Sequence, residues 1–296
     1  MQNHDTRGML YALAGFLTLS IGDAVVKSMA GLWAPTAIAA LRFALGAAGL
    51  SALLLWREGV PAFRPPVPGI QLLRGLGIAV GTIGFFSALS FMPLAEATAI
   101  TFTSPFITSL LAAAFLGEQL RRAQWMAMLT AFAGVLIVLR PNFLAIGWPA
   151  LLPLLSAAGI SMVMIGNRMV AGRSSVLSMQ AYVALAACPL LFAAAALGDW
   201  SGLPRLAVDW PDWSITARCA FVAVTASTAH WLIYLGTARA GAAAVAPMTY
   251  VQLVVATLLG WLVFGDVPDV MSAVGAAIIV GAGLFLLRRP RETQGA

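Results

Sequence analysis

Four ionisable residues stand in or beside long apolar stretches of the sequence, where a charged side chain is costly. Asp23 and Lys27 are four positions apart, which places them one turn apart on one face of a helix. Arg42 lies in the next apolar stretch, and Glu96 begins the fourth. Ionisable groups in such surroundings are usually paired and functional. We predict that these four residues form one charged cluster, acting as a gate or as an electrostatic selectivity site.

Simpler structural roles remain open for the same residues. Lys27 and Arg42 could belong to an ion-pair network that only holds two neighbouring helices together. Glu96 could only cap the helix that it begins, because a carboxylate suits the positive end of a helix dipole.

A second group of residues is polar or aromatic and falls at the middle or inner part of the apolar stretches. Hydroxyl, amide and ring groups at that depth can bind a solute, or can form hydrogen bonds between packed helices. A histidine there can also carry a proton, since its charge changes near neutral pH. The predicted binding residues are Phe86, Thr101, Phe102, Ser104, Asn167, His230, Tyr234, Tyr250 and Gln252.

The sequence lacks the patterns of an enzyme or a metalloprotein. It has no phosphate-binding Gly-rich loop with Lys-Ser/Thr, no HExxH motif and no nucleophile paired with a base at helical spacing. The two cysteines, Cys188 and Cys219, both fall in apolar stretches and indicate neither a disulfide framework nor a metal site. We therefore expect no enzymatic activity, no cofactor and no metal, and any transport should be driven by gradients.

Composition places the whole chain in a membrane. The 296 residues are 61% hydrophobic and 9% charged, with mean hydropathy +0.92, whereas soluble domains carry about 25% charged residues. The net charge of +6 comes from basic residues scattered between apolar stretches, rather than gathered on one face as in a nucleic-acid-binding protein. We expect an integral membrane protein whose partners are the lipid bilayer and a small molecule, not nucleic acid.

The apolar stretches are long enough to cross a bilayer as helices, which takes about 20 residues. Open sheet would leave its backbone groups unsatisfied in lipid, and these runs are too continuous for barrel strands. The predicted spans are 8–28, 35–55, 70–91, 95–115, 123–140, 148–169, 176–197, 214–237, 242–263 and 269–287. Gly77 and Gly81 have the GxxxG spacing that lets two helices approach closely.

The two halves of the chain repeat one another. Phe115-Leu116-Gly117-Glu118 is matched 148 positions later, from 118 to 266, by Val263-Phe264-Gly265-Asp266. Leu139-Arg140-Pro141 is similarly matched by Arg288-Arg289-Pro290. We therefore divide the chain into repeats at 1–145 and 146–296, each with five helices. Because five is odd, the second repeat must be inverted in the membrane.

Charge placement supports the inversion and orients the chain, since loops rich in Lys and Arg stay in the cytoplasm. The turn after Gly117 carries Arg121 and Arg122, whereas the turn after Gly265 carries Asp266 and Asp269. With both termini in the cytoplasm, most loop arginines lie inside. The fold class is then all-α integral membrane, with ten transmembrane helices in two inverted-topology five-helix repeats.

Two stretches carry a resemblance to a known family. Pro93-Leu94-Ala95-Glu96-Ala97-Thr98-Ala99-Ile100 through Glu118, and Tyr250-Val251-Gln252-Leu253 through Asp266, resemble the EamA-type transporters of the drug/metabolite transporter superfamily. The resemblance implies a ten-helix bundle around a central cavity, working by alternating access. The chain departs from the pattern at Leu253, where many members carry a proline that matches Pro105.

These observations predict a secondary active transporter in a bacterial cytoplasmic (inner) membrane. Its substrate would be a small amphipathic metabolite such as an amino acid, S-adenosylmethionine or riboflavin. Coupling to protons or to a counter-substrate, and assembly as a homodimer, stay open. A passive channel for small solutes and a membrane scaffold are the alternatives, and counterflow would separate a carrier from an open pore.

Overall fold

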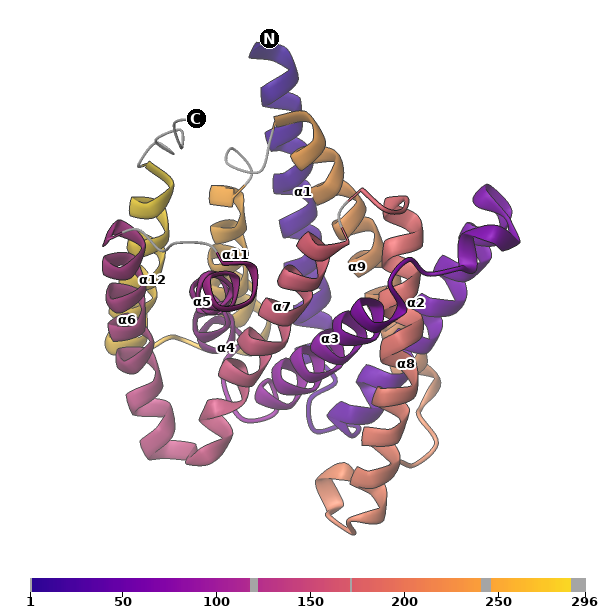
Figure 1. Ribbon diagram of the computed structural model, residues 1–296. Helices are drawn as coiled ribbons and strands as arrows, with labels where there is room; N and C mark the ends of the chain where they lie inside the picture. The colour runs from indigo at the N-terminus through magenta and orange to yellow at the C-terminus, as the bar shows by residue number, and fades with distance from the viewer. Residues whose placement is uncertain (1, 118–121, 171, 241–245, 289–296) are drawn as a thin grey trace.

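The computed structural model describes residues 2–117, 122–170, 172–240 and 246–288, and these form helices joined by short connections (Figure 1). The first half contains α1 (Gln2–Lys27), α2 (Pro35–Glu58), α3 (Pro68–Ala88), α4 (Leu94–Thr101), α5 (Ser104–Leu116) and α6 (Arg122–Ile146). The second half contains α7 (Leu152–Met169), α8 (Val176–Trp200), α9 (Trp213–Ala240), α11 (Val251–Phe264) and α12 (Val270–Arg288). Short 3-10 segments are η1 (Val60–Phe63), η2 (Trp148–Leu151), η3 (Pro204–Leu206) and η4 (Ala246–Tyr250).

The predicted all-α membrane fold is confirmed. Within the residues that the structure describes, seven helical segments are long and apolar enough to cross a bilayer, and three shorter apolar helices fall at Leu129–Arg140, Met248–Phe264 and Val270–Ala282. The described residues contain no strand, only an isolated bridge between Ala30 and Trp33. Glu118, Arg121, Arg289 and Pro290, which the repeat and orientation arguments used, lie outside the described residues.

Two predicted spans are interrupted near their middle, and at matching places. The span 95–115 is divided between α4, which ends at Thr101, and α5, which begins at Ser104. In the second half the 3-10 segment η4 ends at Tyr250 and α11 begins at Val251. A proline at position 105 and a leucine at 253 therefore accompany breaks at corresponding depths, so the interruption does not need a proline in both repeats.

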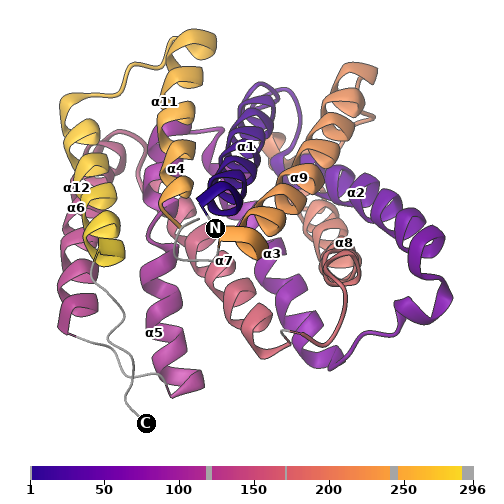
Figure 2. The ribbon, with the colours of Figure 1, turned by 90° about the horizontal axis from the view of Figure 1, so that it is seen from above.

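Helix packing has the symmetry of two exchanged halves. In this comparison α1 corresponds to α7, α3 to α9 and α5 to α11. The pairs α1–α9 and α7–α3 are then equivalent, and so are the pairs α1–α11 and α7–α5. The pairs α2–α8 and α6–α12, each joining corresponding helices, pack directly against one another (Figures 1 and 2). In Figure 1, α1 runs downward and α7 runs upward, so the two repeats have opposite directions.

Glycines bring the crossing helices close enough for backbone contact. A Cβ on Gly77 of α3 would lie 2.8 Å from the carbonyl oxygen of Gly159 in α7. The corresponding crossing of α9 on α1 uses Gly236, where a Cβ would lie 2.7 Å from the Gly8 carbonyl oxygen. Distances below 3.0 Å would force the helices apart, so the predicted close approach at Gly77 is real and occurs between the repeats.

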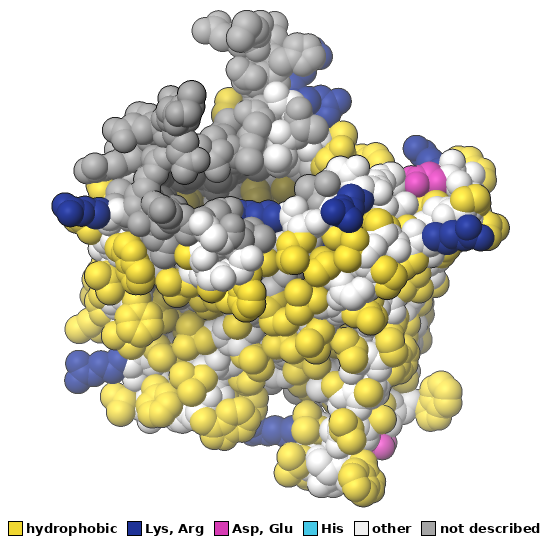
Figure 3. Space-filling view, in the orientation of Figure 1, with side chains coloured by type: hydrophobic (Ala, Val, Ile, Leu, Met, Phe, Trp, Pro, Cys, Tyr) yellow, Lys and Arg dark blue, Asp and Glu magenta, His cyan; other side chains and the backbone are white. Residues whose placement is uncertain are grey.

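The surface has the layered character of a membrane protein. Hydrophobic side chains cover the middle of the face in Figure 3, and most of the visible Lys and Arg side chains lie toward its upper edge. The start of α1 and the end of α12 lie at this same upper end (Figure 1). We call it the N-terminal end below, and the opposite side the far end.

Candidate functional site

A cavity of about 460 Å³ is lined by residues of α2, α3, α7, α8 and α9. Its lining includes the end of α7 and the start of α8, and these helix ends point toward the N-terminal end in Figure 1. Both repeats contribute to its lining, and most of the lining side chains are apolar. Its charged and larger polar groups are Arg42, Arg74, Asn167, Gln180, His230 and Tyr234. A mainly apolar cavity of this size with a few convergent polar groups is typical of small-molecule binding sites.

Arg42 is the least engaged of the charged side chains lining this cavity. Its Nε is buried and has no hydrogen-bond partner among the described residues. Its guanidinium carbon lies 4.4 Å from the ring centroid of Phe43 and 6.0 Å from that of Phe86. Asp23 on α1 interacts with it electrostatically. Stacking on rings holds a guanidinium in place without using its N–H donors.

Arg74, by contrast, donates hydrogen bonds from all three of its guanidinium nitrogens to neutral groups. Its Nε donates to Asn167 Oδ1 at 2.7 Å, and its two terminal nitrogens donate to Gln71 Oε1 and, at 3.2 Å, to the Met179 carbonyl oxygen. Arg74 is 4% exposed. It joins α3 to α7 and α8 at the cavity wall, which suits a structural role.

Sequence analysis missed Arg74, although the signal was present. The residue lies inside the predicted span 70–91, so the cost of a charge in lipid that singled out Arg42 applies to it as well. Gln180, on α8, was also missed.

Three predicted binding residues, Asn167, His230 and Tyr234, do line the cavity. His230 Nδ1 lies 2.7 Å from the Ala226 carbonyl oxygen, and a carbonyl only accepts, so Nδ1 carries the proton of this bond. The other ring nitrogen, Nε2, is left for a ligand or water. Ser227, one turn before His230 on α9, lines the same cavity.

Phe86, another predicted binding residue, lies on α3 beside Arg42. The other predicted binding residues lie at or next to the two helix breaks. The rings of Phe102 and Tyr250 meet edge to face, with centroids 5.7 Å apart and planes at 78°. The Ser104 carbonyl oxygen accepts from Ser161 on α7, and the Gln252 carbonyl oxygen accepts from Ser20 on α1. Each break is thus tied to the first helix of the other repeat. Thr101 is buried, and its hydroxyl donates to the Ala97 carbonyl oxygen.

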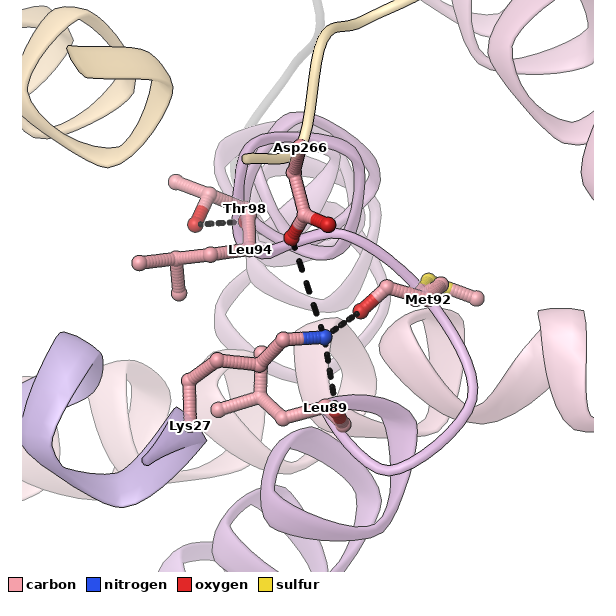
Figure 4. Close-up of polar contacts among 6 residues, drawn as sticks. All are labelled: Lys27, Leu89, Met92, Leu94, Thr98 and Asp266. Carbon is pink, nitrogen blue, oxygen red and sulfur yellow. Dashed lines mark hydrogen bonds and ion pairs between the residues drawn. The ribbon is translucent and has the colours of Figure 1, made fainter. Parts of the chain in front are cut away.

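The far end is tied together by Lys27, at the end of α1 (Figure 4). Its Nζ donates to the carbonyl oxygens of Met92, at 2.7 Å, and Leu89, at 3.0 Å, in the α3–α4 connection. The same nitrogen lies 3.9 Å from Asp266 Oδ2 in the connection between α11 and α12 (Figure 4). One side chain therefore links three segments drawn from both repeats, and we call this group the Lys27 clasp.

Glu96 lies beside the clasp and is 8% exposed. Its Oε1 accepts a hydrogen bond from Ser272 Oγ at 2.9 Å, which joins α4 to α12. Asp269 caps the start of α12 by accepting from the Ser272 backbone N–H. Hydrogen bonding at Ser272 lowers the pKa of Asp269, which precedes the first residue of α12.

The four predicted charged residues therefore lie in two groups rather than in one cluster. Asp23 and Arg42 interact near the cavity, while Lys27 interacts with Asp266 and, electrostatically, with Glu96. The sequence places Asp266 in the turn after Gly265 and assigns it no partner. Its role could not be read from the sequence, because nothing in the spacing tells which helix end meets the α11–α12 connection.

Comparison with known proteins assigns the class. The family model described as the EamA-like transporter family matches residues 6–140 and 147–288. The chain belongs to the EamA-like transporter family. This membership confirms the resemblance inferred from the sequence and, because members are transporters, the expectation that the protein is not an enzyme.

Characterised relatives carry different small molecules. The chain is 31% identical to a riboflavin transporter of Rhizobium johnstonii over 81% of this chain and 77% of that protein. It is 25% identical to an S-adenosylmethionine uptake transporter of Rickettsia prowazekii, covering 98% and 95% of the two chains. It is 29% identical to the pseudopaline exporter CntI of Pseudomonas aeruginosa, covering 95% and 96%.

A solved crystal structure supports the same fold. It superposes with a TM-score of 0.63 at 25% identity, covering 97% of this chain and 100% of that chain. Together with the apolar helices, these relatives define a multi-pass membrane transporter of small molecules.

Proposed function

We propose that the protein is a secondary active carrier that moves a small amphipathic metabolite by alternating access. Candidate substrates are an amino acid, S-adenosylmethionine and riboflavin, the last two being named for its relatives. We place it in a bacterial cytoplasmic membrane with both termini in the cytoplasm. The arginine-rich inner loops support this orientation.

One observation carries the proposal: the cavity lies toward the N-terminal end, while the Lys27 clasp ties the far end together. In a carrier, a binding site between two repeats is exposed to one side of the membrane while the other side is closed. With the N-terminal end in the cytoplasm, this arrangement corresponds to an inward-facing conformation, and opening outward would require release of the clasp.

The broken helices provide a second part of the proposed path. Helix breaks leave backbone groups available near the midplane, where such transporters bind solutes. Tyr250 and Gln252 stand at one break, and Phe102 and Ser104 at the other. We propose that these residues contact the substrate as it passes between the cavity and the far end.

Reconstitution in liposomes tests the proposal. Vesicles preloaded with unlabelled riboflavin, S-adenosylmethionine or an amino acid should take up the same labelled compound faster than empty vesicles. This counterflow is expected of a carrier, and an open pore cannot show it. Loading with and without a pH gradient would separate proton coupling from exchange.

Two variants test the midplane contacts. Gln252→Ala and Tyr250→Ala should each slow counterflow, while Gly49→Ala on α2 should not, because nothing lies within 4 Å of a Cβ at Gly49. If both midplane variants kept the full rate, the proposed contacts would be wrong. If every labelled compound equilibrated without stimulation by preloading, the passive-channel reading would replace the carrier.

A further inference from the structure

The charges around the cavity carry information about the substrate that the relatives do not supply. Among the described residues that line it, two are arginines and none is Asp or Glu. The one carboxylate coupled to Arg42 is Asp23, on α1. Arg42 and Arg74 thus carry two positive charges at the cavity wall, and Asp23 is the carboxylate placed to offset one of them.

The two arginines differ in what they can offer a ligand. The N–H groups of Arg74 are used by Asn167, Gln71 and Met179. Arg42 makes no hydrogen bond or ion pair within 4.0 Å to a described residue, and it is held through its ring contacts. Five donors in a planar fork suit a carboxylate, which can accept two of them at once.

Resting on the proposed carrier function, but replacing the candidate substrates named there, we propose that the substrate is an organic monocarboxylate without a positively charged group. We propose that Arg42 binds its carboxylate. Uncompensated charge in a low-dielectric site is costly, so a single excess cation favours a ligand with one negative charge. A phosphate monoester carries about −1.5 to −2 at neutral pH and would leave negative charge unpaired. A cationic ligand would face two arginines.

The rest of the lining fits the other end of such a molecule. Ile78, Val163 and Val183 supply apolar surface, while Gln180 and Tyr234 supply hydrogen-bonding groups. A volume of about 460 Å³ has room for a ring system with a short acidic chain. A small aromatic or branched carboxylate would therefore occupy both the apolar and the charged parts of the site.

Three indole compounds and one naphthyl phosphate, all with a bicyclic aromatic ring system, test the charge preference. The purified protein would be titrated with indole-3-propionate (anion), tryptophol (neutral), tryptamine (cation) and 1-naphthyl phosphate, with the melting temperature as the readout of binding. We expect indole-3-propionate to bind at least about tenfold more tightly than tryptophol, tryptamine or the phosphate, as for a hydrogen bond to a charged group.

Arg42→Gln should weaken indole-3-propionate binding by about 10- to 100-fold and leave tryptophol binding unchanged. Arg42→Lys should keep the preference for the anion in weaker form. The matched control is Arg218→Gln on α9. It also removes an arginine charge, but Arg218 donates to the Ser28 carbonyl oxygen at the far end rather than lining the cavity. This variant should bind all four compounds as the wild type does. If Arg42→Gln is too unstable to purify, Arg42→Lys with the ligand series serves as the test.

Equal binding of all four compounds, or tighter binding of tryptamine, would overturn the charge assignment. Tighter binding of the phosphate would replace the carboxylate by a phosphate. An anion preference that survives in Arg42→Gln would remove Arg42 from the site. Counterflow measured on the same preparations keeps the two proposals separate: counterflow of tryptamine would overturn only the substrate class, and binding without any counterflow would overturn only the carrier.

Discussion

Phe102 and Tyr250 touch each other across the centre of the molecule, and they are also related by the repeat. Their rings meet edge to face at 5.7 Å, and their positions differ by the same 148 residues that separate Glu118 from Asp266. Each ring stands where its helix is interrupted. The pseudo-symmetry axis therefore passes close to this aromatic pair, and the two breaks support one another.

A double-mutant cycle should detect a stabilising interaction between the Phe102 and Tyr250 rings. Phe102→Leu and Tyr250→Leu each keep an apolar side chain but remove the edge-to-face geometry. We expect a coupling energy of about 0.5–1.5 kcal/mol in the free energy of unfolding, measured by SDS titration in mixed micelles. Strictly additive losses would mean that the two rings are neighbours without a stabilising interaction.

The contacts of the Lys27 clasp predict that substitution of Lys27 destabilises the protein more than substitution of Asp266 does. Its hydrogen bonds to two backbone carbonyls are short, whereas the ion pair with Asp266 is 3.9 Å long. Lys27→Met should therefore cost about 1.5–3 kcal/mol, and Asp266→Asn less than about 1 kcal/mol, in the same unfolding assay. An Asp266→Asn loss as large as that of Lys27→Met would show that the ion pair, not the carbonyl contacts, holds the far end.

The same two variants should differ in how easily the far end opens. Ser227 lines the cavity, so in a background without Cys188 and Cys219 a Ser227→Cys variant reports access to it. A membrane-impermeant maleimide added outside right-side-out vesicles should modify it faster when Lys27→Met is present, and at nearly the original rate with Asp266→Asn. An unchanged rate in Lys27→Met would place the outward barrier elsewhere.

The close crossing of α3 and α7 predicts that alanine is tolerated at Gly49 but not at Gly159. A Cβ on Gly159 would collide with backbone atoms of Gly77 and Gly81, while a Cβ on Gly49 meets nothing within 4 Å. Gly159→Ala should lower the melting temperature sharply or prevent folding. Gly49→Ala should keep or slightly raise it, because alanine is the better helix former. Similar melting temperatures for both would mean that α3 and α7 can separate at no cost.

Opposite orientation of the repeats can be read from labelling of intact cells. In the same cysteine-free background, Asp269→Cys should react with an impermeant maleimide added outside. Arg122→Cys, in the corresponding turn of the first repeat, should react only after the cells are permeabilised. Reaction of both variants from one side would contradict the inverted arrangement, whatever the substrate proves to be.

Much of the architecture could be predicted because it follows from local composition. Apolar run lengths located the helices, and the repeated ending in which an apolar run closes with Gly and an acidic residue located the symmetry. Even the cavity-facing positions of Asn167 and His230 followed from polar residues placed inside apolar runs. What stayed hidden depends on contacts between distant segments. Lys27 meets Asp266, and Arg74 donates hydrogen bonds to Asn167 on α7 and Met179 on α8, through docking angles that no single stretch of sequence contains.

Lys27 is the single lysine of the chain, all the other basic side chains being arginines or histidines. Its ammonium group is held by Leu89 and Met92 when the far end is shut. Apart from the amino terminus, it is thus the one primary amine that an acylating reagent can find. The rate at which an amine-specific reagent acylates Lys27 in the unaltered protein would therefore measure how often the far end opens during turnover.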